Sequence, residues 1–132
     1  MQFITNAVEL NKDVIRLIIK LSNKYTKVVE YNLINTSTQL IDSVMWANSI
    51  RVVDNKTYEE RRSTFKHAKH LVHLLCIQLE AVLDLSIEHD VNDKVKNVEN
   101  ICQRIGEQLD TELKLLDGIM SSDTKKYNSS KI

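Results

Sequence analysis

Apolar residues recur along the chain at steps of three and four residues, the spacing that places side chains on one face of a helix. The pattern is interrupted three times, so it predicts four helices. Asn6 followed by Glu9 is typical of the capping box that begins a helix, and it marks the start of the first segment. The predicted helices span residues 6–27, 30–53, 58–88 and 92–118.

Polar residues and a glycine set the boundaries of the later segments. The stretch "DNKT" breaks the second segment, and Thr57 with Glu60 predicts a capping box for the third. Gly118 follows the last periodic residue of the fourth segment and is expected to end that helix. The polar residues beyond it predict a flexible tail over 121–132, outside a helical domain of residues 1–120.

The composition agrees with long helices, because Pro is absent and only 2 Gly occur among 132 residues. A chain of this length forms one domain with a continuous core. The connections between the predicted helices are short, so consecutive helices should lie antiparallel. The predicted fold is therefore all-α, an antiparallel up-down-up-down four-helix bundle.

The periodic positions of the second and fourth segments predict the core stripes of these helices. In the second segment the stripe consists of Ile34, Ser37, Thr38, Ile41, Val44, Met45, Asn48 and Val52. In the fourth it consists of Val95, Val98, Ile101, Cys102, Ile105, Leu109, Leu113 and Leu116. Asn48 lies on the predicted core stripe, so we expect its side chain to be buried. An unpaired buried amide destabilises a fold by about 1–3 kcal/mol. We therefore also expect Asn48 to be hydrogen-bonded in the core, where it would fix helix register. The alternative is a half-exposed Asn48 near a helix end.

Three of the segments carry a second apolar stripe outside the core stripe. Trp46 belongs to one of these stripes, so we expect its side chain to point away from the core. Ordered apolar stripes on several helices indicate a protein interface, which predicts a homo-oligomer. The predicted interface residues are Val8, Ile15, Ile19, Trp46, Ile50, Leu74 and Leu85.

The charge balance gives no global preference for an anionic partner, because 18 basic residues match 18 acidic residues. No stretch of about 18 apolar residues occurs, so we expect no membrane association. The first ten residues, "MQFITNAVEL", lack the features of a signal peptide, which predicts a cytoplasmic protein. Cys76 and Cys102 are expected to be reduced core thiols.

The sequence contains none of the motifs that would indicate catalysis. A di-iron bundle needs Glu-x-x-His on two helices, and no Glu here precedes a His at that spacing. His67, His70 and His73 rotate around their helix, and a metal at the last two would lack an obvious third ligand. Neither a phosphate-binding glycine loop nor a nucleophile elbow is present. We expect no metal, no cofactor and no enzyme activity.

One face of the third segment is basic. Arg62, Lys66, Lys69 and His73 follow steps of four, three and four residues, so they lie on one side of the helix. Arg51 and Lys56, in the preceding turn, extend this group. We refer to these six residues as the basic stripe and predict that it binds nucleic acid through phosphates. The alternative is a solvated face on which Glu59 pairs with Arg62.

Several short motifs resemble a known family of helical proteins. They lie within the segments "ELNKDVIRLIIKLSNKYTKVVEYNLINTSTQLIDSVMWANSIR" and "YEERRSTFKHAKHLVHLLCIQLEAVLDLS". The matching positions are Gln39, Leu40, Ser43, Val44, Ala47, Asn48 and Ala68. The chain resembles, over roughly residues 8–118, the four-helix-bundle proteins of the ribosomal RNA intervening-sequence family. It is most similar to the accessory variability determinant (Avd) proteins of diversity-generating retroelements. The sequence "NSIRVVD" lacks the Glu-Gly of the intervening-sequence branch, which favours the accessory branch.

This resemblance implies a function that composition and periodicity do not provide. It implies a homopentameric ring that binds a reverse transcriptase, together with RNA or an RNA/DNA hybrid. Such a protein would be non-catalytic and would support mutagenic retrohoming. No RNA-contacting residue of the family matches a motif in this chain, so the basic stripe rests on charge geometry alone. A purely structural oligomeric bundle without a nucleic-acid role remains the alternative.

Overall fold

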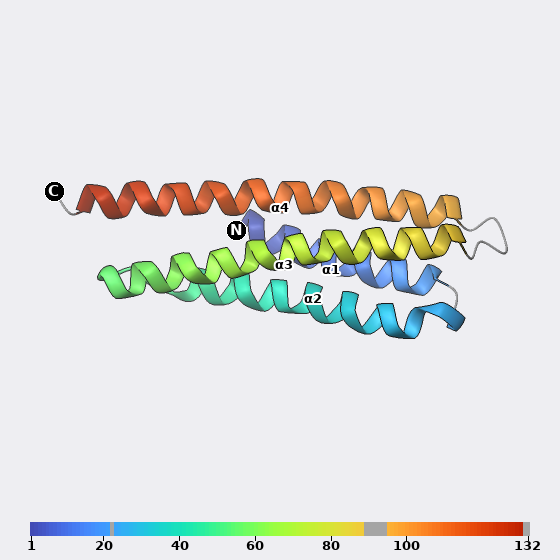
Figure 1. Cartoon of the computed structure of the whole chain (residues 1–132). Helices are drawn as coiled ribbons and strands as arrows, with labels where there is room; N and C mark the ends of the chain where they lie inside the picture. Colours follow the sequence, from blue (N-terminus) through green and yellow to red (C-terminus); the bar gives the residue numbers. More distant parts are fainter. Residues whose placement is uncertain (22, 89–94, 131–132) are drawn as a thin grey trace.

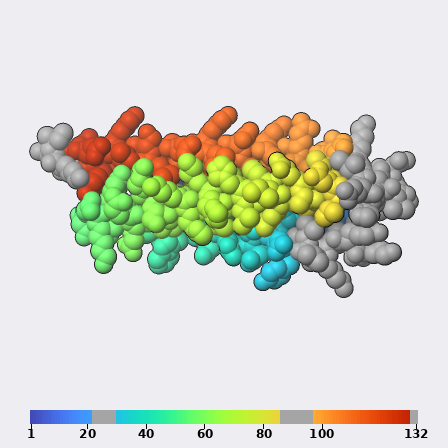
Figure 2. Space-filling model, viewed as in Figure 1, coloured from blue at the N-terminus to red at the C-terminus, as the bar shows by residue number. Residues whose placement is uncertain are grey.

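The computed structural model describes residues 1–21, 23–88 and 95–130. These residues form four helices and no strand, as Figure 1 shows, so the prediction of a four-helix bundle is confirmed. The helices are α1 (Gln2–Lys20), α2 (Asn23–Ser49), α3 (Asn55–Glu88) and α4 (Val95–Ser130). Each helix packs against two neighbours, since α1 contacts α2 and α4 while α3 contacts the same two helices. Figure 2 shows the face on which α3 lies between α4 and α2.

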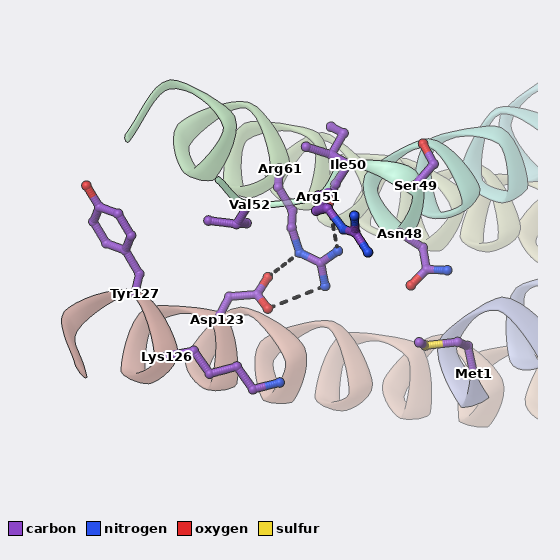
Figure 3. A pocket seen from close by; sticks show the side chains of 10 residues that line it. All are labelled: Met1, Asn48, Ser49, Ile50, Arg51, Val52, Arg61, Asp123, Lys126 and Tyr127. Carbon is purple, nitrogen blue, oxygen red and sulfur yellow. Dashed lines mark hydrogen bonds and ion pairs between the residues drawn. The ribbon is translucent and has the colours of Figure 1, made fainter. Parts of the chain in front are cut away.

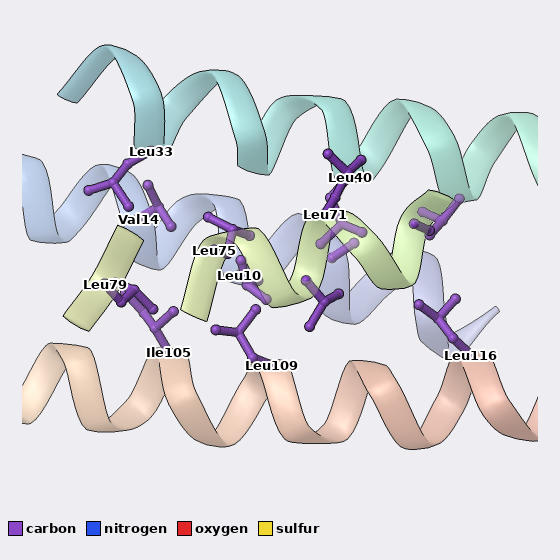
Figure 4. Close-up of a cluster of buried hydrophobic side chains, with 14 of the residues drawn as sticks. Leu10, Val14, Leu33, Leu40, Leu71, Leu75, Leu79, Ile105, Leu109 and Leu116 are labelled. Carbon is purple, nitrogen blue, oxygen red and sulfur yellow. The ribbon is translucent and has the colours of Figure 1, made fainter. Parts of the chain in front are cut away.

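A continuous apolar core runs along the bundle axis (Figure 4). Its largest fully buried apolar side chains are Phe65, Leu10, Leu17, Leu33, Leu40, Leu75, Ile105, Leu109 and Leu116. All four helices contribute to this set, because each presents one stripe to the centre. Near one end, Phe3 and Phe65 pack edge to face with ring centroids 5.5 Å apart. Truncating a core leucine to alanine in such a setting destabilises a protein by about 2–5 kcal/mol.

The core stripe of α2 differs from the predicted one. The buried positions are Leu33, Thr36, Ser37, Leu40, Ser43, Val44 and Ala47. Ile34 and Met45, which we predicted in the core, are exposed instead. The helix is therefore rotated toward its small and hydroxyl-bearing residues.

Hydrogen bonds to the neighbouring helices make this rotation possible, because they satisfy the buried hydroxyls of Ser37 and Ser43. Ser37 Oγ accepts a hydrogen bond of 2.8 Å from Asn11 Nδ2 on α1 and donates to the Ile34 carbonyl. Ser43 Oγ donates to the Thr64 carbonyl on α3. On α3, Leu71 is buried as well.

The helix ends also differ from the predicted ones. α1 begins at Gln2, four residues before the predicted start, and ends at Lys20 instead of residue 27. α2 begins at Asn23 instead of residue 30 and ends at Ser49 instead of residue 53. Asp54, not Thr57, precedes α3, and its Oδ1 accepts the Thr57 N–H at 2.8 Å. These bonds from Thr57 hold the pKa of Asp54 below its ordinary value. Thr57 Oγ1 in turn accepts the Val53 and Asp54 N–H groups, so the two side chains cap the helix together.

The fourth helix contains the largest departure from prediction. Gly118 does not end α4, which continues through most of the predicted flexible tail to Ser130. The extension lies against the start of α3, where Tyr58 hydroxyl and Thr124 Oγ1 are 2.9 Å apart. The Tyr127 ring stacks on the Tyr58 ring at a centroid distance of 4.1 Å. Contacts between distant segments therefore hold a polar sequence in a helix. Residues 131–132 lie outside the described part of the chain.

Candidate nucleic-acid interface and interaction surfaces

The basic stripe lies along the edge of α3 that faces α4. Lys69 Nζ is 2.6 Å from Asp117 Oδ1, and Arg62 Nη1 is 3.1 Å from Thr124 Oγ1. Lys66, between these two residues on the stripe, is exposed. Two of the three central cations are therefore engaged by α4, and Lys66 is the one that faces solvent. Glu59 is exposed, while Arg62 bonds to α4 instead of pairing with it.

The remaining members of the basic stripe are exposed, and the structure adds two further cations. Arg51 and Lys56 lie in or beside the α2–α3 connection, and His73 lies farther along α3. Lys125 and Lys126 lie on the α4 extension, which ion-pairs with Arg61 near the start of α3. Sequence reasoning missed these two lysines because it placed them in a flexible tail. Cations from α3, α4 and the α2–α3 connection thus gather toward one end of the bundle, where Asp54, Glu59 and Glu60 are also exposed.

Asn48 is half-buried, so the prediction that it lies in the core is wrong, and the alternative holds. The core position next to it belongs to Ala47, because α2 is rotated. Asn48 is also the penultimate residue of α2. Its side chain lines a hollow at the end of the bundle, which Figure 3 shows from close by.

The predicted interface residues divide between two surfaces. Trp46 points away from the core as predicted, with 62% of its surface exposed. It follows Ser43 by three residues, and Ser43 bonds to α3, so Trp46 lies on the α3 side of α2. Ile50 and Leu74 are half-buried, and Leu85 is exposed.

The second surface combines α1 with Tyr31 of α2 and with three α2 residues that we had assigned to the core. The Asn11–Ser37 bond aligns the two helices, and helical spacing places their apolar stripes on either side of it. The α1 residues are Val8, Ile15 and Ile19, and the α2 residues are Tyr31, Ile34, Ile41 and Met45. We call this set the α1–α2 face. Ile19 and Tyr31 are its most exposed members, at 73% and 72%.

A carboxyl group lies in the middle of the core, where sequence reasoning placed none. Glu112 has no exposed surface, and both carboxylate oxygens lack a hydrogen-bond partner among the described residues. Burial raises the pKa of Glu112 to about 8, while the nearby Asn6 amide acts in the opposite direction. Asn6 Nδ2 donates its hydrogen bond to the Gln108 carbonyl instead. The spacing of Leu109, Glu112 and Leu116 indicates that Glu112 lies on the core stripe of the fourth segment. We assigned Leu113 to that stripe instead, because its side chain is apolar.

Cys102 is buried and Cys76 is half-buried, and both are free thiols. Burial raises the pKa of Cys102 to about 11 and also raises the pKa of Cys76, which keeps both thiols protonated at neutral pH. The His67 and His70 rings lie 6.3 Å apart. Within the described ranges, no three His, Cys, Asp or Glu side chains are grouped as a metal site.

No helix in the described part of the chain combines the length and apolar character needed to cross a bilayer. Comparisons with protein-family models, with curated proteins and with solved structures each find no match to this chain.

Proposed function

We propose that this protein is a non-catalytic, oligomeric accessory protein of the Avd type that binds a reverse transcriptase and its RNA. In this proposal the helices follow up-down-up-down order and the subunits form a pentameric ring. The observation that carries it is the gathering of cations at one end of the bundle. Lys66 and Lys125 are exposed there and take part in no ion pair among the described residues. The resemblance of the sequence to accessory proteins adds the reverse transcriptase as partner.

The mode of RNA binding follows from the charge distribution. The chain is neutral overall, and Asp117 and Asp123 neutralise Lys69 and Arg61 at the basic end. One subunit therefore offers a modest positive surface. Several copies in a ring would present it repeatedly, and simultaneous contacts raise the affinity without any new bond. Phosphate contacts depend little on base sequence and weaken steeply with salt.

Reversing Lys66 and Lys125 together to Glu should lower RNA affinity at least tenfold at low salt, because each reversal replaces attraction to phosphate by repulsion. Affinity is measured by fluorescence anisotropy with a labelled single strand over a series of salt concentrations. The logarithmic salt dependence should also become shallower, by about one unit of slope for each phosphate that the variant no longer neutralises. The matched control reverses Lys20 and Lys114, which are exposed, lie outside the basic stripe and form no ion pair with the described residues. Equal affinity for the wild type and the Lys66/Lys125 variant would refute an RNA role for this surface.

Oligomer formation is tested on the α1–α2 face. Replacing Ile19 and Ile34 with Glu should convert the oligomer to a monomer that remains helical, because charges would be buried at the interface. Mass is measured by light scattering after size exclusion, and helicity by circular dichroism. The control is Thr111→Glu, which adds a charge on the exposed side of α4. Trp46→Glu reports separately on the α2–α3 side. A wild-type protein that is monomeric at micromolar concentration would contradict the proposal.

The second candidate function is a structural oligomeric bundle without a nucleic-acid role. The engagement of Arg62 and Lys69 by α4 favours it, because side-chain bonds already hold two cations of the basic stripe. In that case the oligomer forms and responds to the substitutions on the α1–α2 face, while RNA affinity is negligible in the wild type.

A further inference from the structure

A hollow of about 600 Å³ lies at the basic end of the bundle (Figure 3). The end of α2, the residues that follow it, the start of α3 and the end of α4 form its walls. Met1 also lines the hollow, and both Met1 and the α4 residues are far from residues 48–61 in the sequence. Only the tertiary structure therefore creates the hollow. Its volume is within the range of about 300–1,000 Å³ that is typical of small-molecule sites.

Arg61 fixes the shape of the hollow. Its Nε and Nη2 atoms donate to the two carboxylate oxygens of Asp123, at 2.6 and 3.3 Å. Its Nη1 atom donates to the Ala47 and Ile50 carbonyls at 3.2 and 3.3 Å. Arg61 thus joins α2, α3 and α4, and Asp123 neutralises its charge. A ligand in the hollow would therefore meet the charges of other residues.

Two cations in the hollow remain available. Arg51 and Lys126 both line it, both are exposed, and the described residues include no ion pair of either side chain. Figure 3 shows Arg51 on the wall that follows α2, while Lys126 extends from α4 on the opposite wall. Asp123, the only carboxylate among the described residues of the lining, is already bound by Arg61. Arg51 and Lys126 therefore contribute two positive charges that are available to a ligand.

Other lining groups suit a nucleotide. The half-buried Asn48 amide lines the hollow and makes no hydrogen bond with the described residues. Met1, Ile50 and Val52 contribute apolar surface. The planar guanidinium of Arg51 can bind a phosphate with two parallel hydrogen bonds. Cations, one free amide and an apolar wall together match a phosphate attached to a nucleoside.

We propose that this hollow binds a nucleotide through a phosphomonoester, either at the end of an RNA strand or in a free mononucleotide. A phosphomonoester carries a charge of about −1.5 to −2 at neutral pH, which two cations can neutralise. An internal phosphodiester carries a single negative charge and would match the site less well. The RNA-end form rests on the proposed function, whereas the free-nucleotide form does not.

The experiment compares RNAs of one sequence with hydroxyls at both ends, or with a phosphate at the 5′ or the 3′ end. AMP and adenosine are measured in parallel by calorimetry. The wild type should bind at least one phosphorylated RNA about tenfold more tightly than the hydroxyl RNA, and AMP more tightly than adenosine. The Arg51→Gln/Lys126→Gln variant should lose this preference. Lys114→Gln removes an exposed cation of α4 that lies outside both the lining and the basic stripe, and it should keep the preference.

Each outcome separates the two proposals. If the hydroxyl RNA binds and no phosphate preference exists for RNA or AMP, the nucleotide site is refuted and the RNA-binding function stands. If AMP binds through Arg51 and Lys126 but no RNA binds, the hollow is a mononucleotide site and the proposed function fails. A preference that persists in the double variant assigns the phosphate to other residues and overturns the inference. Circular dichroism confirms that each variant is folded.

Discussion

Replacing Glu112 with Gln should increase the free energy of unfolding at pH 8–9. The substitution should also remove most of the pH dependence of this free energy above pH 4.5. Glu112 is fully buried on the core stripe of α4, and its carboxylate has no hydrogen-bond partner among the described residues. Burial raises its pKa from 4.5 to about 8 in the folded state. The folded protein therefore retains a proton that the unfolded chain releases.

The direction of the pH effect follows from that difference in bound protons. Below pH 4.5 the carboxyl is protonated in both states, so no penalty exists. Between 4.5 and about 8 only the folded state holds the proton, and stability decreases as the pH rises. The slope for one such group reaches about 1.4 kcal/mol per pH unit. Above that range the penalty is constant, at several kcal/mol.

Urea unfolding of both proteins at half-unit steps from pH 4.5 to 9 measures this effect. The two curves should coincide at the acidic end and separate at the alkaline end, with the Glu112→Gln variant more stable. The matched control is Glu107→Gln, which removes an exposed carboxylate from the same helix. Parallel pH profiles for the wild type and Glu112→Gln would show that the carboxyl is not protonated in the folded state.

Replacing Arg61 with Met should destabilise the protein by about 3 kcal/mol, because a partly buried charge loses its partner. Arg61 and Asp123 each expose only 13% of their side-chain surface. The substitution leaves the Asp123 carboxylate unpaired and removes the donor for the Ala47 and Ile50 carbonyls. It also releases the α4 extension from the start of α3. In the Arg61→Met variant, the backbone amides of residues 121–130 should therefore exchange with solvent faster than in the wild type, and faster than those of the core of α4.

Chemical denaturation and hydrogen exchange provide the two measurements. Lys69→Met is the matched control, because the Lys69–Asp117 pair has a similar length of 2.6 Å but exposes 32% and 60% of the two side chains. An exposed pair contributes about 0–1 kcal/mol, so this control should change stability little. The double variant Arg61→Met/Asp123→Leu should recover part of the loss. Equal effects of Arg61→Met and Lys69→Met would contradict the special role of Arg61.

The sequence by itself determined the number of helices and the position of most of each helix. Periodic apolar residues, the absence of Pro and the break at "DNKT" each reflect local rules of spacing and backbone conformation, which act within one segment. The outward direction of Trp46 also followed from spacing. Arg62, Lys66, Lys69 and His73 share a face of α3 for the same reason.

Only the tertiary structure decided the rotation of α2, the length of α4 and the burial of Glu112. Burial of Ser37 and Ser43 requires partners on α1 and α3, and the α4 extension is held by Tyr58 and Arg61 of α3. A local pattern does not contain these partners, so it favoured larger apolar residues for the core and a flexible tail. The hollow at the basic end has the same origin, because it exists only where the ends of α2 and α4 meet the start of α3. Side-chain spacing is a property of one helix, whereas the burial of a polar group depends on what its neighbours in space can donate or accept.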